Sequence, residues 1–428
     1  MSNFSERFET LKIRDFRLLW IGQSVSSVGT EMQRFAIPLH IYAILDGTAF
    51  DITLFGRVFE LDAATLGLGA VGLVRVVPIM VFALIGGILA DIINRRKLLM
   101  VTESISALLV LILGVLTYTG AQSVGLLYLF SGALAATTAI STPTRQSLVP
   151  NLVPDRLMTN AVSLNTLVFQ IGSITGPVIA SLLVSFFGRS SVYFIDAMTF
   201  SAAIFTLFLM NYRGKAATSE PFNWELAKEG LIFTYTTKIL WGSILLDFFA
   251  TFFGSAKTML PAVADQILGL DLNTQSGNFW LGILAGAQPI GAFGAGLAMA
   301  LIRDVRRQGI VMLSGVALYG VATALFGLSP FFALSYLFFA LTGVGDTISM
   351  VIRGTLRQVV TPDHLRGRAT SVASIFFMGG PQLGELEAGV VAALFGVPVA
   401  IFTGGVAVVL LTGWVAWRYP TLRDYQLT

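Results

Sequence analysis

The 428-residue sequence contains no cysteine and only two histidines, His40 and His364. These absences exclude a disulfide framework, a thiol nucleophile and a Cys-ligated metal, and they argue against a His-based metal site or catalytic triad. Charged residues are also scarce, at 12% against about 25% in an ordinary soluble domain. The net charge of +3 is too small to indicate a nucleic-acid partner. The composition therefore excludes most soluble enzyme classes.

Hydrophobic residues, in contrast, make up 55% of the chain. A helix that spans a membrane needs about 20 mostly apolar residues, and runs of that length recur along the sequence between short polar or Gly/Pro-marked breaks. The sequence therefore predicts an all-α integral membrane protein with twelve transmembrane helices. We place them at 17–44, 63–91, 97–119, 122–145, 159–187, 190–211, 239–266, 278–302, 309–328, 331–356, 367–394 and 397–418.

The loops differ in their basic residues. Lys and Arg gather at the N-terminus, in the loops after the even-numbered spans and at the C-terminus, whereas the opposite side shows only Arg57 and Arg189. Basic residues near the ends of spans resist translocation, so both termini are expected in the cytoplasm and the protein in the plasma (inner) membrane. The first span follows a charged stretch without a cleavage pattern and is interpreted as uncleaved.

The longest polar interruption, Asn211 to Lys238, divides the spans six and six. It predicts an N-terminal bundle at 1–211, a cytoplasmic linker at 212–238 and a C-terminal bundle at 239–428. Within the linker, Trp224 to Tyr235 is predicted to form a short helix on the membrane surface.

An internal repeat supports this division. A shift of 208 residues brings identical Arg, Asp, Pro and Gly residues into alignment, which chance matches between apolar helices do not explain. The matches include Gly86 with Gly294, Arg95 with Arg303, Arg145 with Arg353, Pro154-Asp155 with Pro362-Asp363, Gly172 with Gly380, Gly176 with Gly384 and Gly188 with Gly396. Two six-helix bundles related by a pseudo-twofold axis along the membrane normal are typical of major facilitator transporters.

The turn after the second span carries a motif. Residues 87–97 read GILADIINRRK, and they resemble the major facilitator signature G-x-L-A-D-R-x-G-R-(R/K). Ile92 and Asn94 depart from that pattern. The resemblance implies that this turn latches the two halves in an outward-facing state; its residues are Gly87, Asp91, Arg95 and Arg96.

Span 5 contains Gly172, Gly176 and Pro177, similar to the G-x-x-x-G-P-x-x-G-G element of exporters in this superfamily, with Ala180 and Ser181 in place of the last glycines. Gly-xxx-Gly permits close helix contact, and a proline inside a helix removes a backbone hydrogen bond. An ordinary packing seam explains the glycines equally well, and the proline favours the exporter element. The repeat places Gly380 and Gly384 at the equivalent positions of span 11.

Further stretches resemble the branch that contains the enterobactin exporter and macrolide-efflux proteins. They are 14–20 (RDFRLLW), 143–150 (PTRQSLVP), 353–358 (RGTLRQ) and 362–368 (PDHLRGR). The resemblance implies proton-linked export of amphipathic small molecules, with siderophores and antibiotics as leading classes. The expected partners are a small-molecule substrate and membrane lipid, with no nucleic acid; the expected state is a monomer, and the proton gradient replaces any cofactor.

Ionisable residues inside spans cost several kcal/mol and are candidates for function. Each could instead be a permanently paired structural charge, which we favour for Arg145 and Arg353; Asp196 and Lys257 are expected near water. Glu31 and Arg34 share a helix face, whereas Glu385 and Glu387 do not. The proposed proton-coupling acids are Glu31, Asp247, Asp346 and Glu385, with Arg34, Arg75 and Arg353 as partners.

The sequence is also compatible with two other functions. A protein of the same fold could move a lipid such as a lysophospholipid. A membrane enzyme or a non-transporting sensor is less favoured, because the sequence has no HExxH, GxSxG or nucleotide-binding loop. The external loop at 51–62 is either a small cap over the outer mouth or a tolerated insertion, and we favour the insertion.

Overall fold

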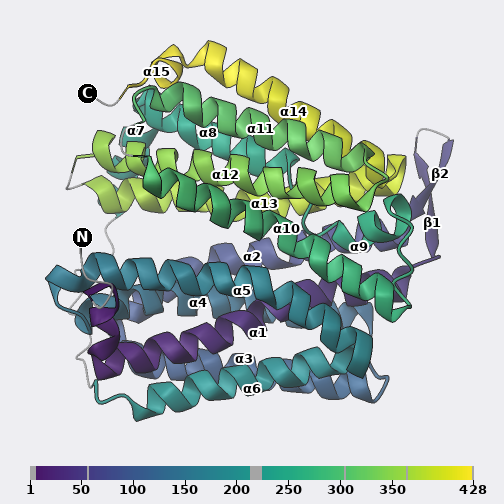
Figure 1. Cartoon of the computed structure of the whole chain (residues 1–428), viewed down its shortest axis with the longest axis horizontal. Coiled ribbons are helices and arrows are strands. Elements are labelled where there is room, and N and C mark those ends of the chain that lie inside the picture. The colour runs from purple at the N-terminus through teal and green to yellow at the C-terminus, as the bar shows by residue number, and fades with distance from the viewer. Residues whose placement is uncertain (1–5, 55–56, 213–223, 303–304, 363–364, 427–428) are drawn as a thin grey trace. The chain divides into compact units, whose positions relative to one another are not determined.

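The computed structural model describes residues 6–54, 57–212, 224–302, 305–362 and 365–426 (Figure 1). Its first half is helical apart from one hairpin. The elements are a 3-10 turn η1 (Glu6–Lys12), α1 (Arg14–Leu45), β1 (Ala49–Leu54), β2 (Arg57–Asp62), α2 (Ala63–Ile92), α3 (Arg95–Tyr118), α4 (Val124–Leu148), η2 (Val149–Asn151), η3 (Asp155–Leu157), α5 (Met158–Phe187) and α6 (Arg189–Leu209).

The second half contains helices and no strand among its described residues. Its elements are α7 (Trp224–Thr236), α8 (Lys238–Phe253), α9 (Leu260–Ala262), the π-helical η4 (Val263–Ile267), α10 (Gln275–Leu301), α11 (Gln308–Leu328), α12 (Phe332–Val360), α13 (Arg366–Phe395), α14 (Val397–Arg418) and α15 (Pro420–Arg423). The helix predicted at Trp224 forms as α7. Its place on the membrane surface and the three domain boundaries stay predictions.

The chain forms two compact units. Unit 1 contains Met1–His40, Val77–Glu220 and Thr274–Gly282, and unit 2 contains Ile41–Val76, Pro221–Asn273 and Ile283–Thr428. In unit 1, α3 packs against α4 and α6. In unit 2, α11 packs against α12 and α14 around a core that includes Met312 and Leu356. The helices α1, α2 and α10 each continue from one unit into the other.

Eleven of the twelve predicted spans coincide with single long helices, and the all-α prediction is confirmed apart from the hairpin. Among the described residues, nine helices are long and apolar enough to cross a membrane by length and composition. The helices α1, α8 and α13 are not in that set, and these three carry Glu31, Asp247 and Glu385. Three of the four acids proposed for coupling thus lie outside the set, α8 because it has only 16 residues, whereas Asp346 lies on α12, which is within it.

The prediction of span 7 as one helix is wrong. The helix α8 ends at Phe253, and the chain resumes as the short α9 and then η4. Where α8 stops, the Gly254 carbonyl accepts from the Ala256 amide at 2.9 Å and from the Tyr319 hydroxyl at 2.7 Å. Such breaks in a membrane segment are tolerated where protein groups satisfy the exposed backbone.

The external loop is an antiparallel β-hairpin in which Asp51 lies opposite Glu60. Its second strand packs against α13 within unit 2. The loop is thus ordered as two paired strands, and its interpretation as a tolerated insertion or a cap stays a prediction.

The repeat is visible in the backbone. Gly188 joins α5 to α6 with φ +79°, and Gly396, its equivalent, joins α13 to α14 with φ +88°. Residues with a Cβ rarely adopt this conformation, so both turns require glycine. At Asn94, where the sequence departs from the signature, the side chain caps α3 by accepting from the amides of Arg96 (3.1 Å) and Lys97 (3.3 Å).

Candidate functional site

The clearest cluster of charges in unit 2 joins α8 to α12. Arg353 on α12 forms an ion pair with Asp247 on α8, and its Nη2 lies 3.7 Å from Oδ1 of Asp346. Asp346 and Arg353 are two helical turns apart on α12 and so share a face. The Arg353 and Asp247 side chains are largely buried, whereas that of Asp346 is 47% exposed. Three of the predicted coupling residues are thus brought together.

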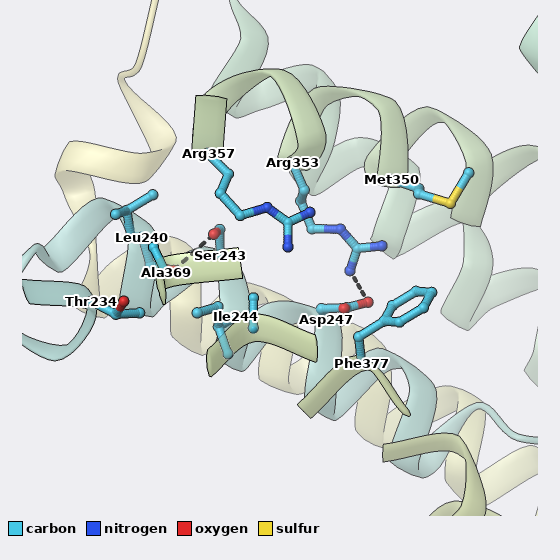
Figure 2. Close-up of a pocket in the computed structure, with 11 residues that line it drawn as sticks. Thr234, Leu240, Ser243, Ile244, Asp247, Met350, Arg353, Arg357, Ala369 and Phe377 are labelled. Carbon is cyan, nitrogen blue, oxygen red and sulfur yellow. Dashed lines mark hydrogen bonds and ion pairs between the residues drawn. The ribbon is translucent and has the colours of Figure 1, made fainter. Parts of the chain in front are cut away.

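A pocket adjoins this pair. Arg357 lies one turn beyond Arg353 on α12, and both guanidinium groups reach toward α8 (Figure 2). Arg357 makes no hydrogen bond or ion pair with any residue that the structure describes. The pocket is lined from α7, α8, α12 and α13 by Thr234, Leu240, Ser243, Ile244, Asp247, Met350, Arg353, Arg357, Ala369, Ala373 and Phe377.

This lining combines an apolar wall with a local excess of positive charge. The wall is aliphatic and aromatic, with Ile244 and Phe377 among its members, while two arginines, Arg353 and Arg357, face one carboxylate of the lining, Asp247. A guanidinium binds planar anionic groups well, and an apolar wall binds ring systems. The pocket suits an amphipathic molecule with an anionic or hydrogen-bond-accepting end. Sequence reasoning missed Arg357 because it counted the residue as part of a basic loop.

In unit 1 the predicted local pair on α1 is confirmed. Arg34 Nη1 lies 2.6 Å from Oε1 of Glu31. Glu31 is buried, whereas the Arg34 side chain is 41% exposed. The pair therefore has a buried anion and a partly exposed cation.

A second pair in unit 1 was missed from the sequence. Arg145 on α4 donates from Nη2 to Oε1 of Glu103 on α3 at 2.6 Å, and Ser26 on α1 donates to Glu103 Oε2 at 3.4 Å. Glu103 is a lone carboxylate in the predicted span 97–119, so the rule that singled out the other intramembrane acids would have found it. The pairing agrees with the structural role favoured for Arg145.

The glycines of span 5 have a direct packing role. A Cβ at Gly172 would lie 2.6 Å from Oγ of Ser27, and a Cβ at Gly176 would lie 2.6 Å from the Cβ of Glu31. Only glycine lets α5 approach α1 this closely. The seam therefore runs directly past the Glu31 carboxylate.

The equivalent glycines of span 11 pack in the same way. A Cβ at Gly380 would lie 2.6 Å from Oγ1 of Thr251 on α8, and one at Gly384 would overlap the Phe252 carbonyl. Thus α5 packs on α1 in unit 1 as α13 packs on α8 in unit 2. The repeat predicted from sequence is present in the helix contacts. Both Pro177 and Pro381 lie inside continuous helices.

Glu385 is buried on α13 beside α2, where a Cβ at Gly72 would lie 2.7 Å from the Cβ of Glu385. Arg75, one turn further along α2, is half-buried. Glu387 is less buried than Glu385, in line with the prediction that the two do not share a face.

The predicted latch is described only in part. The surroundings of Gly87 and the side chain of Asp91 lie outside what the structure describes. Arg95 donates to the Ser147 carbonyl at 3.1 Å, and Arg96 donates to three carbonyls at the end of α6. These contacts bind helix ends within unit 1, and a latch between halves stays a prediction.

The expectation that Asp196 lies near water is wrong. Its side chain on α6 is 0% exposed, because α1 approaches at Gly29 so closely that a Cβ there would overlap both Asp196 and Thr199. Lys257, in contrast, is exposed as expected. Hydropathy locates a residue along its helix but does not show which helices pack against it. The sequence therefore did not reveal that α1 buries Asp196.

Comparison with known proteins shows which family this chain resembles. A family model described as transmembrane secretion effector matches residues 5–424. The multidrug efflux pump Tap of Mycolicibacterium fortuitum is 26% identical over 93% of this chain and 99% of its own length. The enterobactin exporter EntS of Shigella dysenteriae serotype 1 is 25% identical over 90% of this chain and 86% of its own.

Solved structures of low identity show the same fold. A bacterial homologue of the human lysosomal transporter Spinster, in an inward-facing and unoccupied conformation, has a TM-score of 0.71 at 14% identity and covers 96% of this chain and 98% of its own. A D-xylose–proton symporter has a TM-score of 0.69 at 14% identity, covering 96% and 99%. The predicted fold class is confirmed.

Proposed function

Because the chain belongs to the transmembrane secretion effectors of the major facilitator superfamily, and is thus a multi-pass membrane transporter and not an enzyme, we propose that it exports small amphipathic molecules by proton antiport. Siderophores and drug-like compounds are the proposed substrate classes. Both relatives named above are exporters by name, which supports the direction of transport.

The observation that carries the proposal is the pocket beside Asp247. Its apolar wall would hold the ring system of an amphipathic substrate, and Arg357 would hold an anionic or acceptor group. A substrate that binds Arg357 lies next to the Arg353–Asp247 pair and would compete for Arg353. Substrate and proton would then compete at the same ion pair, which would couple their movements in opposite directions.

The coupling acids proposed from the sequence stay Glu31, Asp247, Asp346 and Glu385. A carboxylate holds its proton when desolvated and releases it when water or an arginine approaches. Alternating access would supply these two environments in turn, while the glycine seams at Gly176 and Gly384 would let helices slide without separating.

Transport into inverted membrane vesicles tests this function. An acid interior should drive accumulation of fluorescein or ethidium, two amphipathic dyes of opposite charge, and a proton–cation exchanger that collapses the gradient should abolish it. Asp247→Asn should remove the gradient dependence. Accumulation that is equal with and without the gradient would overturn proton coupling, and no accumulation of either dye, or of a catecholate siderophore, would overturn export. Uptake of lysophospholipid alone would favour the lipid alternative.

A further inference from the structure

Asp196 is a carboxyl group that the proposed function leaves without a role. It lies on α6 at 0% exposure. The hydroxyl of Thr199, one turn away on the same helix, is shared between the Asp196 backbone carbonyl at 2.8 Å and Oδ1 at 3.1 Å. Its Oδ2 is buried and has no hydrogen-bond partner among the described residues.

The charges around Asp196 do not neutralise it. The nearest ones are Glu103 on α3 and Arg34 on α1. Arg34 already pairs with Glu31 at 2.6 Å, and Arg145, the other arginine of this region, pairs with Glu103 at 2.6 Å.

The remaining neighbour, α5, carries no ionisable side chain anywhere between Met158 and Phe187. No cation contacts the Asp196 carboxyl in the part of the chain that the structure describes.

The protonation state follows from these contacts. An ionised carboxylate in an apolar interior, with one oxygen unpartnered and a second carboxylate nearby, costs several kcal/mol. A neutral carboxylic acid avoids that cost, and the Thr199 hydroxyl satisfies its carbonyl oxygen. In the arrangement described, Asp196 therefore holds a proton that water does not reach.

We propose that Asp196 is a proton-binding site of the transport cycle, an inference that rests on the proposed proton antiport. Oδ2 takes a proton from water on one side of the membrane and gives it to water on the other, with no other bond made or broken. Gly29 on α1 seals the carboxyl, and Arg34 lies five residues along the same helix with a partly exposed side chain. A shift of α1 along α6 would open the seal and bring the Arg34 guanidinium toward Asp196, which favours release of the proton.

Infrared spectroscopy of the purified full-length protein tests the site without a substrate. Wild-type protein at neutral pH should show the carbonyl-stretch band of a protonated carboxylic acid, and Asp196→Asn, which keeps the size of the side chain, should lose the contribution of Asp196 to it. Asp155→Asn, at an exposed aspartate of the same half, is the matched control and should keep the band. Wild-type protein grown with carboxyl-13C aspartate should show the band shifted, a measurement that needs no folded variant. A band that neither Asp196→Asn nor the isotope changes overturns the proposal.

Transport separates this inference from the proposed function. In inverted vesicles, Asp196→Asn should lose the accumulation of fluorescein or ethidium driven by an acid interior but keep the exchange of dye across vesicles without a gradient. Gradient-driven accumulation equal to wild type overturns Asp196 as a proton site of the cycle, whatever the infrared result. If wild-type protein accumulates neither dye, proton-driven export fails, and the proposal that depends on it falls, although the infrared band still reports whether Asp196 holds a proton.

Discussion

Arg145 and Arg353 occupy equivalent positions of the internal repeat, yet they pair with carboxylates from different helices. Arg145 pairs with Glu103 on α3, and that carboxylate is 5% exposed. Arg353 pairs with Asp247 on α8, has Asp346 within 3.7 Å, and adjoins the pocket that contains Arg357. The duplication kept the cation and changed its anion.

The sequence shows how this difference arose. The first-half positions equivalent to Asp247, Asp346 and Arg357 hold Leu39, Thr138 and Val149, and the second-half position equivalent to Glu103 holds Val311. One half thus has a closed pair between adjacent helices. The other half has a pair with spare charge beside a pocket. The first arrangement is suited to stability and the second to binding and coupling.

The largest expected effect is on stability. Glu103→Leu leaves the partly buried Arg145 guanidinium without its counter-ion, and it should lower the free energy of unfolding by about 3–5 kcal/mol. Asp247→Leu should cost less, roughly 1–3 kcal/mol, because Arg353 keeps Asp346. Denaturant titration of the detergent-solubilised protein measures both. The double variant Glu103→Leu with Arg145→Met should recover most of the loss, and equal losses in the two halves would contradict the comparison.

The next effect concerns binding. Arg357→Ala removes the unpaired guanidinium of the pocket and should weaken binding of fluorescein by about 10–100-fold, the value of one charge-assisted hydrogen bond. Binding of ethidium, a cation, should not weaken. Fluorescence titration measures both dissociation constants. Arg306→Ala, at an exposed arginine, is the control, and an equal loss for the two dyes would show that Arg357 shapes the pocket without reading charge.

A smaller effect should appear equally in both halves. Gly176→Ala and Gly384→Ala each place a methyl group into a helix seam and should cost about 1–3 kcal/mol of unfolding free energy. Gly379→Ala, at a position with nothing within 4 Å of the added atom, should change it little. Thermal unfolding of the three variants side by side is the measurement. A loss in only one half would mean that the two seams are not equivalent.

The smallest effect belongs to the first half alone. Asn94→Ala removes the cap of α3 and should cost about 1 kcal/mol. The repeat-equivalent residue is Ile302, and α11 begins without a side-chain cap. Hydrogen exchange at the amides of Arg96 and Lys97 should quicken in the variant. Unchanged exchange would show that the Asn94 side chain does not protect the start of α3.

Eleven of the twelve spans were predictable because a membrane interior leaves a helix few alternatives, so apolar length alone locates it. The break after Phe253 was not predicted, since an average over a window hides Gly254 and Pro261 within an apolar run. The glycine seams followed from spacing and from the repeat, which are properties of the chain itself.

The pairing of charges was less predictable. The pair of Arg34 with Glu31 was predictable because the two residues share one helix, and helical geometry fixes that contact. The pair of Arg353 with Asp247 depends on the packing of α12 on α8, which no local sequence pattern specifies. The burial of Asp196 depends on a glycine of another helix. Local charge pairs could therefore be predicted from sequence, whereas pairs and seals between helices required the structure.

The β1–β2 hairpin offers a site for an engineered, reversible disulfide. Asp51 and Glu60 are exposed partners across the two strands, and the Cα atoms of such partners lie about 4.5–5.5 Å apart. That separation suits a disulfide, and the chain has no cysteine of its own to compete. Cysteines introduced at positions 51 and 60 would be the only thiols in the protein. Oxidant and reductant would then lock and release the ribbon between α1 and α2 in a single preparation, with every helix unaltered.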